Sequence, residues 1–390
     1  MKKGSQSGWI TSMKIRQVDL ISQYDHIRRE IDEAVLRCIG SGEYINGKEV
    51  SAFAENLASY SGAKYVIPCA NGTDALQISL MALNLQPGDE VIVPAFTYVA
   101  SAEAIALLRL IPVLVDVDSR TFNMDVEKFK NAISDKTKAV IPVHLFGQVC
   151  DMQPVLEIAK QHHIHIVEDN AQSIGAVYSL PDGEKQQAGT IGDIGALSFF
   201  PTKNLGCYGD GGAMLTNNEI LANKLKMISA HGQSQKYHHD VIGCNSRLDT
   251  LQAAILNVKL KYIDKYIKSR QAAAEYYTKQ LQMLNDYIVL PYSAGYSTHV
   301  YNQYTIQVKG EKRDNLKQFL LEKGVPSMIY YPLPLHHQKA FKDNIRIGSD
   351  LSRSEQLCRS VLSLPMHTEL DKTQQDYIID SVKQFFTNKL

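Results

Sequence analysis

The chain has 390 residues, and its 41 lysines and arginines balance its 41 aspartates and glutamates, so the formal net charge at pH 7 is zero. This balance leaves no excess of positive charge of the kind that binds nucleic acid or an anionic membrane surface. With 44% hydrophobic and 21% charged residues, the composition is that of a folded protein with a large core. The length suits two or three domains, and we expect one large domain and one smaller one.

Targeting and redox signals favour a cytoplasmic protein. No stretch approaches the roughly 18 to 20 uninterrupted apolar residues of a membrane span, and an arginine and a proline interrupt the best run, 104–115. The basic N-terminal residues lack the apolar segment and the cleavage site of a signal peptide. Six cysteines without a CxxC pair indicate reduced structural thiols, and the histidines at 162, 163 and 165 lack metal-ligand spacing. We therefore expect no membrane contact and no metal.

Between residues 65 and 216, short apolar runs rich in β-branched residues alternate with stretches of helical period. Strands are expected at 65–70, 90–94, 112–116, 139–143, 164–168, 196–200 and 212–216. Helices are expected at 73–83, 99–108 and 152–162. Strands this apolar, alternating with helices, predict an α/β fold whose mainly parallel central sheet is covered by helices on both faces.

The pattern changes after residue 216, where helices are expected at 218–231 and 249–277 before a smaller C-terminal α+β segment. We place a domain boundary inside the long second helix. This boundary gives a large domain, 1–258, and a small C-terminal domain, 259–390. The polar, turn-forming residues 179–189 predict a surface hairpin or loop.

In a sheet of this kind ligands bind beyond the carboxyl ends of the strands, so the residues that follow each strand are candidate site residues. The sequence NGTDAL at 71–76 opens a helix, where free N–H groups and the helix dipole suit a phosphate group. Tyr98 follows the second strand, and its ring could stack on a flat cofactor. Taken singly, a helix cap and a packing aromatic are the commoner interpretations of these two features.

Two further places carry charge. In VEDNAQS at 167–173, Asp169 ends an apolar strand, and a buried carboxylate needs a protonated ring nitrogen, a salt bridge or a capping role. Lys203 lies between an aromatic strand and a glycine-rich loop, where a desolvated amine can act as a nucleophile or a base. Most lysines are solvated surface charges. However, a phosphate cradle, an aromatic ring, an aspartate and a lysine at one sheet edge together supply what pyridoxal phosphate needs.

Six segments carry a resemblance to a known family. They read GEYINGKEV (42–50), CANGTDALQ (69–77), PGDEVIVPAFTYVA (87–100), VEDNAQSIGA (167–176), SFFPTKNLGCYGDGGA (198–213) and GCNSRLDTLQAAIL (243–256). On these motifs nearly the whole chain resembles the sugar aminotransferases of the DegT/DnrJ/EryC1/StrS family. The resemblance implies a pyridoxal-phosphate-dependent enzyme of aspartate aminotransferase fold, known as fold type I.

The resemblance implies roles for single residues around the cofactor ring. Lys203 would bind pyridoxal 5'-phosphate covalently, and Asp169 would pair with the pyridine nitrogen and keep it protonated. Gln172 would lie against the ring near its phenolic oxygen, while Tyr98 would stack on the opposite face. Family members with histidine at the position of Lys203 dehydrate their substrates, so the lysine here favours transamination.

The resemblance also implies a phosphate site and a substrate site. The phosphate would be held by Thr73, Asp74 and Ser198 of one chain and by Asn245 of another, which implies a homodimer with shared active sites. Candidates for contact with the substrate are Arg247, Tyr330 and Tyr331. For Arg247, a structural ion pair is an equally good interpretation.

The implied reaction has two halves. L-glutamate would convert the cofactor to pyridoxamine 5'-phosphate, which would pass the amino group to the keto carbon of a nucleotide-linked sugar. The segments 198–213 and 231–256 resemble enzymes that aminate C3 of UDP-2-acetamido-3-keto-2-deoxy-glucuronic acid for lipopolysaccharide O-antigen and related surface glycans. The alternative is C3 amination of a dTDP-3-keto-6-deoxyhexose.

Three features depart from the family pattern. Asn170 stands where many members have alanine, the loop 181–188 is longer, and Tyr330 stands where members that act on acidic sugars often have histidine. A non-catalytic sensor of cofactor or nucleotide sugar is a further alternative, against which the complete set of cofactor residues argues. A nicotinamide-dependent enzyme would need a GxGxxG fingerprint that the chain lacks.

Overall fold

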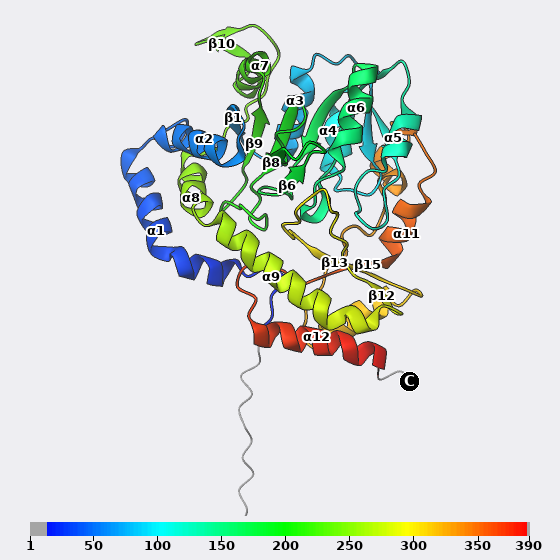
Figure 1. Ribbon diagram of the computed structural model, residues 1–390. Coiled ribbons are helices and arrows are strands. Elements are labelled where there is room, and N and C mark those ends of the chain that lie inside the picture. The colour runs from blue at the N-terminus through cyan, green and yellow to red at the C-terminus, as the bar shows by residue number, and fades with distance from the viewer. Residues whose placement is uncertain (1–13, 388–390) are drawn as a thin grey trace, which may run out of the picture.

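An eight-stranded sheet lies at the centre of the computed structural model, which describes residues 14–387 (Figure 1). Its strand order is β1-β9-β8-β5-β4-β2-β3-β14. The bounds are β1 Tyr65–Cys69, β2 Glu90–Pro94, β3 Ile111–Val115, β4 Thr137–Val140, β5 His165–Asp169, β8 Ile194–Ser198, β9 Gly212–Thr216 and β14 Arg346–Ile347. The strands from β8 to β14 in this order are parallel, whereas β9 runs antiparallel to β1 and β8. The predicted mainly parallel sheet is confirmed.

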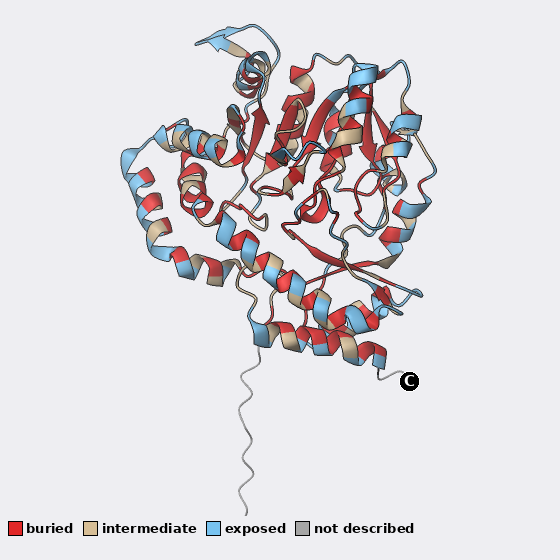
Figure 2. Cartoon of the chain, in the orientation of Figure 1, coloured by how far each residue is buried: buried red, intermediate tan, exposed pale blue. Residues whose placement is uncertain are grey.

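Helices cover both faces of this sheet, and its inner strands are buried almost throughout, whereas the edge strands β1 and β14 are more exposed (Figure 2). One hydrophobic cluster lies under α3 Gly72–Ala82, α4 Ala100–Leu107 and α7 Glu219–Ser229. The other lies under α2 Lys48–Ser61, α5 Val126–Ala132, α6 Met152–His162 and α8 Thr250–Leu260, and α1 Leu20–Ser41 packs against α8. This double cover explains why strands such as β2 are apolar on both faces.

The C-terminal part contains a smaller antiparallel sheet with the order β12-β13-β15. Its strands are β12 Ile288–Val289, β13 Tyr304–Val308 and β15 Val361–Leu364, and its helices are α9 Ile263–Leu281, α10 Arg313–Glu322 and α12 Lys372–Thr387. These elements share a hydrophobic cluster, and α9 lies beside α12 (Figure 1). However, α11 Ser352–Ser360 packs on the core of the large sheet and β14 extends it, so the division at 258/259 stays a prediction.

The long helix expected at 249–277 is wrong, because two helices, α8 and α9, occupy this stretch. The chain turns at Tyr262, whose N–H donates to Lys259 O at 3.0 Å, and α9 starts at Ile263. α8 buries most of its residues between α1 and the large core, whereas α9 contacts that core only at its start, through Ile263 and Ile267, and then packs on the C-terminal part. Neither glycine nor proline marks the break, so it follows from packing and leaves no local signal in the sequence.

Two hairpins stand outside the main sheets. β6 Val177–Ser179 and β7 Lys185–Gln187 form the hairpin expected near 179–189. β10 Gln233–Gln235 and β11 His238–His239 form a second one, which projects beside α7 (Figure 1). The 3-10 turns are η1 Leu145–Gly147, η2 Gln282–Leu284, η3 Leu335–His337 and η4 Lys339–Phe341.

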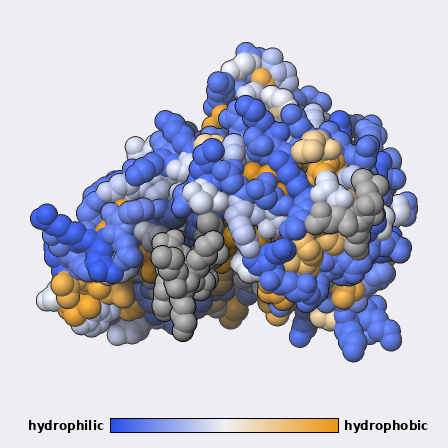
Figure 3. Space-filling model, turned by 90° about the horizontal axis from the view of Figure 1, so that it is seen from below, coloured by the Kyte–Doolittle hydropathy of each residue, from blue (hydrophilic) through white to orange (hydrophobic). Residues whose placement is uncertain are grey.

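The outer helices turn apolar residues inward. In α12 the buried side chains Ile378, Val382 and Phe385 recur at helical spacing. The face of the molecule in Figure 3 is largely hydrophilic, with hydrophobic side chains in small separate groups. Within residues 14–387, no helix has the length and hydropathy of a membrane span. All six cysteines are free thiols.

Candidate active site

A cavity of about 510 Å³ opens beyond the carboxyl ends of the parallel strands. Eight of the predicted site residues line it: Thr73, Tyr98, Asp169, Gln172, Ser198, Lys203, Tyr330 and Tyr331. The other three, Asp74, Asn245 and Arg247, are not among its lining residues. The topology therefore gathers residues from five separate segments of the chain in one place.

The N-terminus of α3 forms one wall of the cavity. Asn71 caps this helix, and its Oδ1 accepts the Asp74 N–H at 2.8 Å. The Asp74 N–H predicted to bind phosphate is therefore already engaged, whereas the Gly72 and Thr73 N–H groups have no acceptor among residues 14–387. A Cβ on Gly72 would lie 2.6 Å from Ser198 Cβ, so glycine allows the Ser198 hydroxyl to approach this helix end. Free N–H groups, the helix dipole and a hydroxyl form an anion site.

Asp169 ends β5 and is 6% exposed. Ser101 Oγ donates to its Oδ2 at 2.7 Å, and the Ala171 N–H donates to its Oδ1 at 3.2 Å. Ser101 also lies 3.2 Å from the Thr97 hydroxyl, so a short chain of hydroxyls supports the carboxylate. Within residues 14–387 Asp169 forms no ion pair, so the carboxylate lacks a cation where the cavity begins. The sequence alone does not indicate the contribution of Ser101, which lies one helical turn after Tyr98.

Lys203 lies on the loop between β8 and β9, and its N–H donates to Phe200 O at 2.8 Å. Gly206 lets this loop fold tightly, because a Cβ there would lie 2.3 Å from Pro201 O. The residue as a whole is half-buried, and its side-chain amine has no hydrogen-bond partner in the described part of the chain. Burial lowers the pKa of Lys203 to about 8, and the negative charge of Asp169 acts in the opposite direction. The amine is therefore neutral more often than that of a surface lysine.

Two aromatic side chains, Tyr98 and Tyr331, and the carboxamide of Gln172 form a further part of the cavity wall. Gln172 Oε1 accepts the Phe146 N–H at 2.6 Å, and its Nε2 donates to Tyr331 Oη at 3.3 Å, so both ends of this carboxamide are held. The Tyr331 ring lies 5.9 Å from the Tyr98 ring. Tyr98 is 56% exposed, which leaves one aromatic face free at the cavity edge. Burial also raises the pKa of Tyr331, which keeps its hydroxyl protonated.

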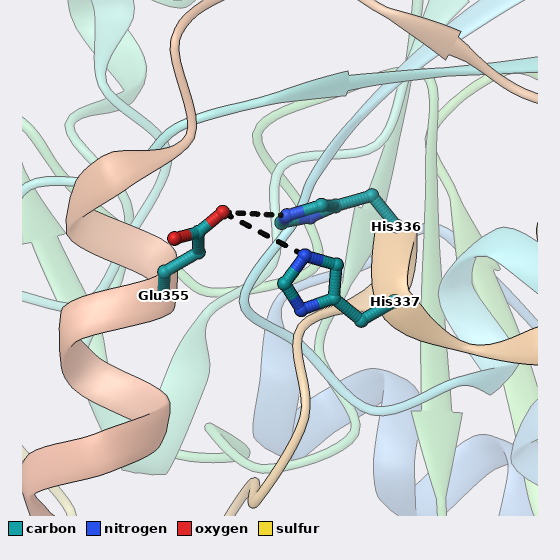
Figure 4. A group of neighbouring side chains, drawn as sticks. All are labelled: His336, His337 and Glu355. Atoms are coloured by element: carbon teal, nitrogen blue, oxygen red, sulfur yellow. Dashed lines mark hydrogen bonds and ion pairs between the residues drawn. The ribbon is translucent and has the colours of Figure 1, made fainter.

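The segment that carries Tyr330 and Tyr331 is tied to the large core by an ion-pair cluster (Figure 4). His336 Nε2 lies 3.2 Å from Glu355 Oε1, and His337 Nε2 lies 3.7 Å from the same oxygen. The other carboxylate oxygen faces Arg359 at 3.7 Å. The hydrogen bond from His336 lowers the pKa of Glu355. Because a guanidinium completes it, we interpret the cluster as a structural clamp between η3 and α11.

Asn245 and Arg247 lie outside this cavity, on the segment that follows the β10–β11 hairpin. The Ser246 hydroxyl accepts the Ala70 N–H at 3.0 Å, which holds the segment at the end of β1. Asn245 is exposed and Arg247 half-buried, and neither side chain forms a hydrogen bond or ion pair within residues 14–387. One chain therefore does not bring these two side chains to its own cavity.

A family model, the DegT/DnrJ/EryC1/StrS aminotransferase family, matches residues 25–383. The chain belongs to this family. The resemblance to this family is confirmed, and the protein is an aminotransferase that uses pyridoxal phosphate.

Three relatives of the DegT/DnrJ/EryC1/StrS family illustrate its range. A UDP-2-acetamido-2-deoxy-3-oxo-D-glucuronate aminotransferase of Pseudomonas aeruginosa is 44% identical over 92% of this chain and 96% of its own. A pleiotropic regulatory protein of Geobacillus stearothermophilus is 43% identical over 96% and 99%. A dTDP-3-amino-3,4,6-trideoxy-alpha-D-glucose transaminase of Streptomyces venezuelae is 38% identical over 94% and 95%.

A solved structure adds the cofactor. NtdA from Bacillus subtilis, solved with bound pyridoxamine phosphate, is 32% identical to this chain. The match covers 96% of this chain and 83% of NtdA, and the two superpose with a TM-score of 0.86. The cavity fits such a cofactor, because its unpartnered groups match the cofactor's functional groups. Free N–H groups suit the phosphate, the Asp169 carboxylate suits a protonated ring nitrogen, and the Lys203 amine suits an aldehyde.

Proposed function

We propose that this aminotransferase moves an amino group from L-glutamate to the C3 keto group of a nucleotide-linked sugar, with UDP-2-acetamido-3-keto-2-deoxy-glucuronic acid as the acceptor. The observation that carries the proposal is the placement of the Lys203 amine and the buried Asp169 carboxylate in one cavity of about 510 Å³. The 44% identical relative from Pseudomonas aeruginosa supports this acceptor.

The roles of the cavity residues follow from their chemistry. Pyridoxal phosphate supplies, when bound, an aldehyde that accepts an amine and a ring that withdraws electrons from the substrate carbon. Lys203, with its lowered pKa, is the nucleophile that holds the cofactor, and its amine moves the proton to and from the substrate carbon. Asp169 keeps the ring nitrogen protonated, with Ser101 fixing the orientation of the carboxylate.

The remaining predicted residues bind and orient. Ser198 and the free N–H groups of Gly72 and Thr73 hold the phosphate, while Tyr98 covers one ring face. Gln172 is held by Phe146 and Tyr331 at the ring edge. Tyr330 and Tyr331 line the cavity, contact the substrate there and exclude water from the reacting carbon.

A homodimer with shared active sites would explain why Asn245 and Arg247 lie outside the cavity of their own chain. Both lie beside a projecting hairpin segment in which Tyr237 and Ile242 are 80% and 88% exposed. Large apolar side chains exposed together favour a protein contact. Asn245 would then reach the phosphate of the second copy's cofactor, and Arg247 would meet the acidic group of its sugar.

Two alternatives to this function are another acceptor sugar and a non-catalytic role. The Streptomyces relative supports a dTDP-3-keto-6-deoxyhexose as the acceptor. The name of the Geobacillus relative raises a regulatory, non-catalytic role, but a sensor has no need of an amine with a lowered pKa beside a buried carboxylate. We place the activity in the cytoplasm, in the synthesis of lipopolysaccharide O-antigen or a related surface polysaccharide.

The test offers the purified enzyme a panel of enzymatically prepared keto-sugars with L-glutamate and identifies amino-sugar products by mass spectrometry. We expect the UDP-linked uronic acid to be aminated with the highest kcat/KM. The Lys203→Ala variant should form no product, and Lys138→Ala, which removes an exposed lysine, should leave turnover unchanged. Product formation without Lys203, or no amination of any sugar, would contradict the proposal.

A further inference from the structure

Two neighbouring carboxamides, Asn302 and Gln303, line the cavity but take no part in the roles described above. They are 3% and 7% exposed. Neither side chain forms a hydrogen bond within the described residues, and Asn302 Oδ1 is buried without any donor. Buried side-chain amides in folded proteins are nearly always hydrogen-bonded, so the unpartnered Asn302 Oδ1 needs an explanation, and so does the neighbouring Gln303 carboxamide, which has no partner among the described residues although its residue is largely buried.

Gln172 provides the contrast within the same cavity. Its Oε1 and Nε2 are both engaged, by Phe146 and by Tyr331. A carboxamide that served only to fix the local structure would be satisfied in the same way. Asn302 and Gln303 therefore retain donors and acceptors that an occupant of the cavity can use.

The backbone that carries the two carboxamides is firmly placed. Arg270 Nη1 donates to Tyr301 O at 3.1 Å and to Asn302 O at 3.4 Å, and the Gln303 N–H donates to Phe146 O at 3.4 Å. Gly147 allows this approach, because a Cβ there would lie 2.9 Å from Asn302 N. The side chains thus stand on a fixed loop that lines the same cavity as Gln172, a common arrangement for ligand-binding groups.

The charges of the cavity indicate what these groups recognise. The charged lining residues are Lys203, Asp169 and Asp210, so Lys203 is the one lysine or arginine among those that line the cavity. The two carboxylates of L-glutamate need cations. The hydroxyl and acetamido groups of a sugar are neutral and combine donor with acceptor, which is the complement of a carboxamide.

We infer that Asn302 and Gln303 form a subsite for the neutral hydrogen-bonding substituents of the acceptor sugar and so determine specificity for it. This inference rests on the proposed function and assigns part of the same cavity to one of its two substrates. It predicts that the two halves of the reaction respond differently to changes at these positions.

The experiment measures the half-reactions separately in the holoenzyme with Asn302→Ala, with Gln303→Leu and with both. Loss of the hydrogen bonds should lower the rate constant for UDP-2-acetamido-3-keto-2-deoxy-glucuronic acid by about tenfold or more in the double variant. The rate constant for L-glutamate should stay within about twofold, which also shows that the variant is folded. Gln318→Leu, an exposed carboxamide on α10, is the matched control.

Two further measurements test the inference: the affinity for a stable sugar nucleotide and the effect of an added negative charge. The dissociation constant of UDP-N-acetylglucosamine, a stable probe, should rise in the double variant by about tenfold. Gln303→Glu should disfavour the uronic acid relative to its C6-alcohol counterpart by about tenfold, because it adds a like charge. Equal losses in both half-reactions, or no loss with the sugar, would overturn the inference. If the unmodified enzyme reacts with L-glutamate but with no keto-sugar, the proposed function fails instead.

Discussion

Ser101 Oγ donates a hydrogen bond to Asp169 Oδ2 at 2.7 Å, which fixes the carboxylate at the end of β5 where the cavity begins. Because the donor comes from α4 and the acceptor from β5, the orientation of this carboxylate depends on the packing of two elements. Ser101 acts through Asp169 and is a positioning residue.

The Ser101–Asp169 bond can be tested by two variants. Asp169→Asn removes the charge that stabilises a protonated ring nitrogen, so kcat should fall by about a hundredfold or more. Ser101→Ala keeps the charge but frees its orientation, and a loss of about tenfold in kcat with unchanged KM for L-glutamate is expected. Steady-state kinetics check both, and equal losses in the two variants would contradict a positioning role for Ser101.

The contact between Gly72 and Ser198 predicts a steric effect on cofactor binding. In Gly72→Ala the new Cβ would lie 2.6 Å from Ser198 Cβ, so the end of α3 and β8 must separate. The dissociation constant of pyridoxal phosphate should rise by about tenfold or more, measured by fluorescence titration of the apoenzyme. Gly40→Ala is the matched control, because a Cβ there meets no atom within 4 Å. Unchanged cofactor affinity in Gly72→Ala would show that this approach is not required.

The amine of Lys203 predicts a pH dependence in the apoenzyme. Burial lowers its pKa from 10.5 to about 8, so the neutral, nucleophilic form increases as the pH rises through about 8. The rate of covalent attachment of pyridoxal phosphate should rise with pH and level off above about 9. A profile whose midpoint stays near 10.5 would contradict the burial of this amine.

The same shift affects stability. Between about 8 and 10.5 the unfolded chain binds more protons at Lys203 than the folded apoenzyme does. The contribution of Lys203 to the free energy of unfolding therefore rises with pH across this window. Denaturant unfolding of the unmodified apoenzyme and of Lys203→Met isolates this contribution. The free energy of unfolding of the unmodified protein, minus that of the variant, should rise with pH, and a fall would contradict the prediction.

The clamp in Figure 4 predicts a change in substrate binding rather than in chemistry. Glu355→Gln removes the charge that holds His336 and His337, which follow Tyr330 and Tyr331 in the chain. We expect KM for the sugar to rise about two- to fivefold while covalent attachment of the cofactor is unchanged, since exposed ion pairs are individually weak. Glu322→Gln on α10 is the control. A loss of cofactor attachment would contradict this division of roles.

Much of the large sheet could be predicted because its strands are apolar and its helices amphipathic. β2, β9 and α6 have the predicted bounds, whereas β4 starts at Thr137 and not at residue 139. The break between α8 and α9 could not be predicted, because it follows from packing against different parts of the molecule. Periodicity detects a buried face but does not say which partner buries it.

The candidate site, too, could be predicted from the sequence only in part. Asp169 and Lys203 could be predicted because Asp169 ends one strand of the sheet and Lys203 comes shortly after another. The neighbouring Glu168 is buried as well, but it accepts three N–H groups of the loop 189–192 and contacts His144, so its role is structural. Asn302 and Gln303 could not be predicted, because these loop residues, distant in sequence, reach the cavity through the close approach to Gly147.

The most direct test of the account is the visible absorption spectrum of the purified enzyme with pyridoxal phosphate, before and after addition of L-glutamate. We predict a visible band that depends on Lys203 and shifts to the absorption of the pyridoxamine form when L-glutamate is added. The band should be absent in Lys203→Ala. A band that survives in this variant, or one that does not respond to L-glutamate, would contradict the assigned amine or the assigned donor, respectively.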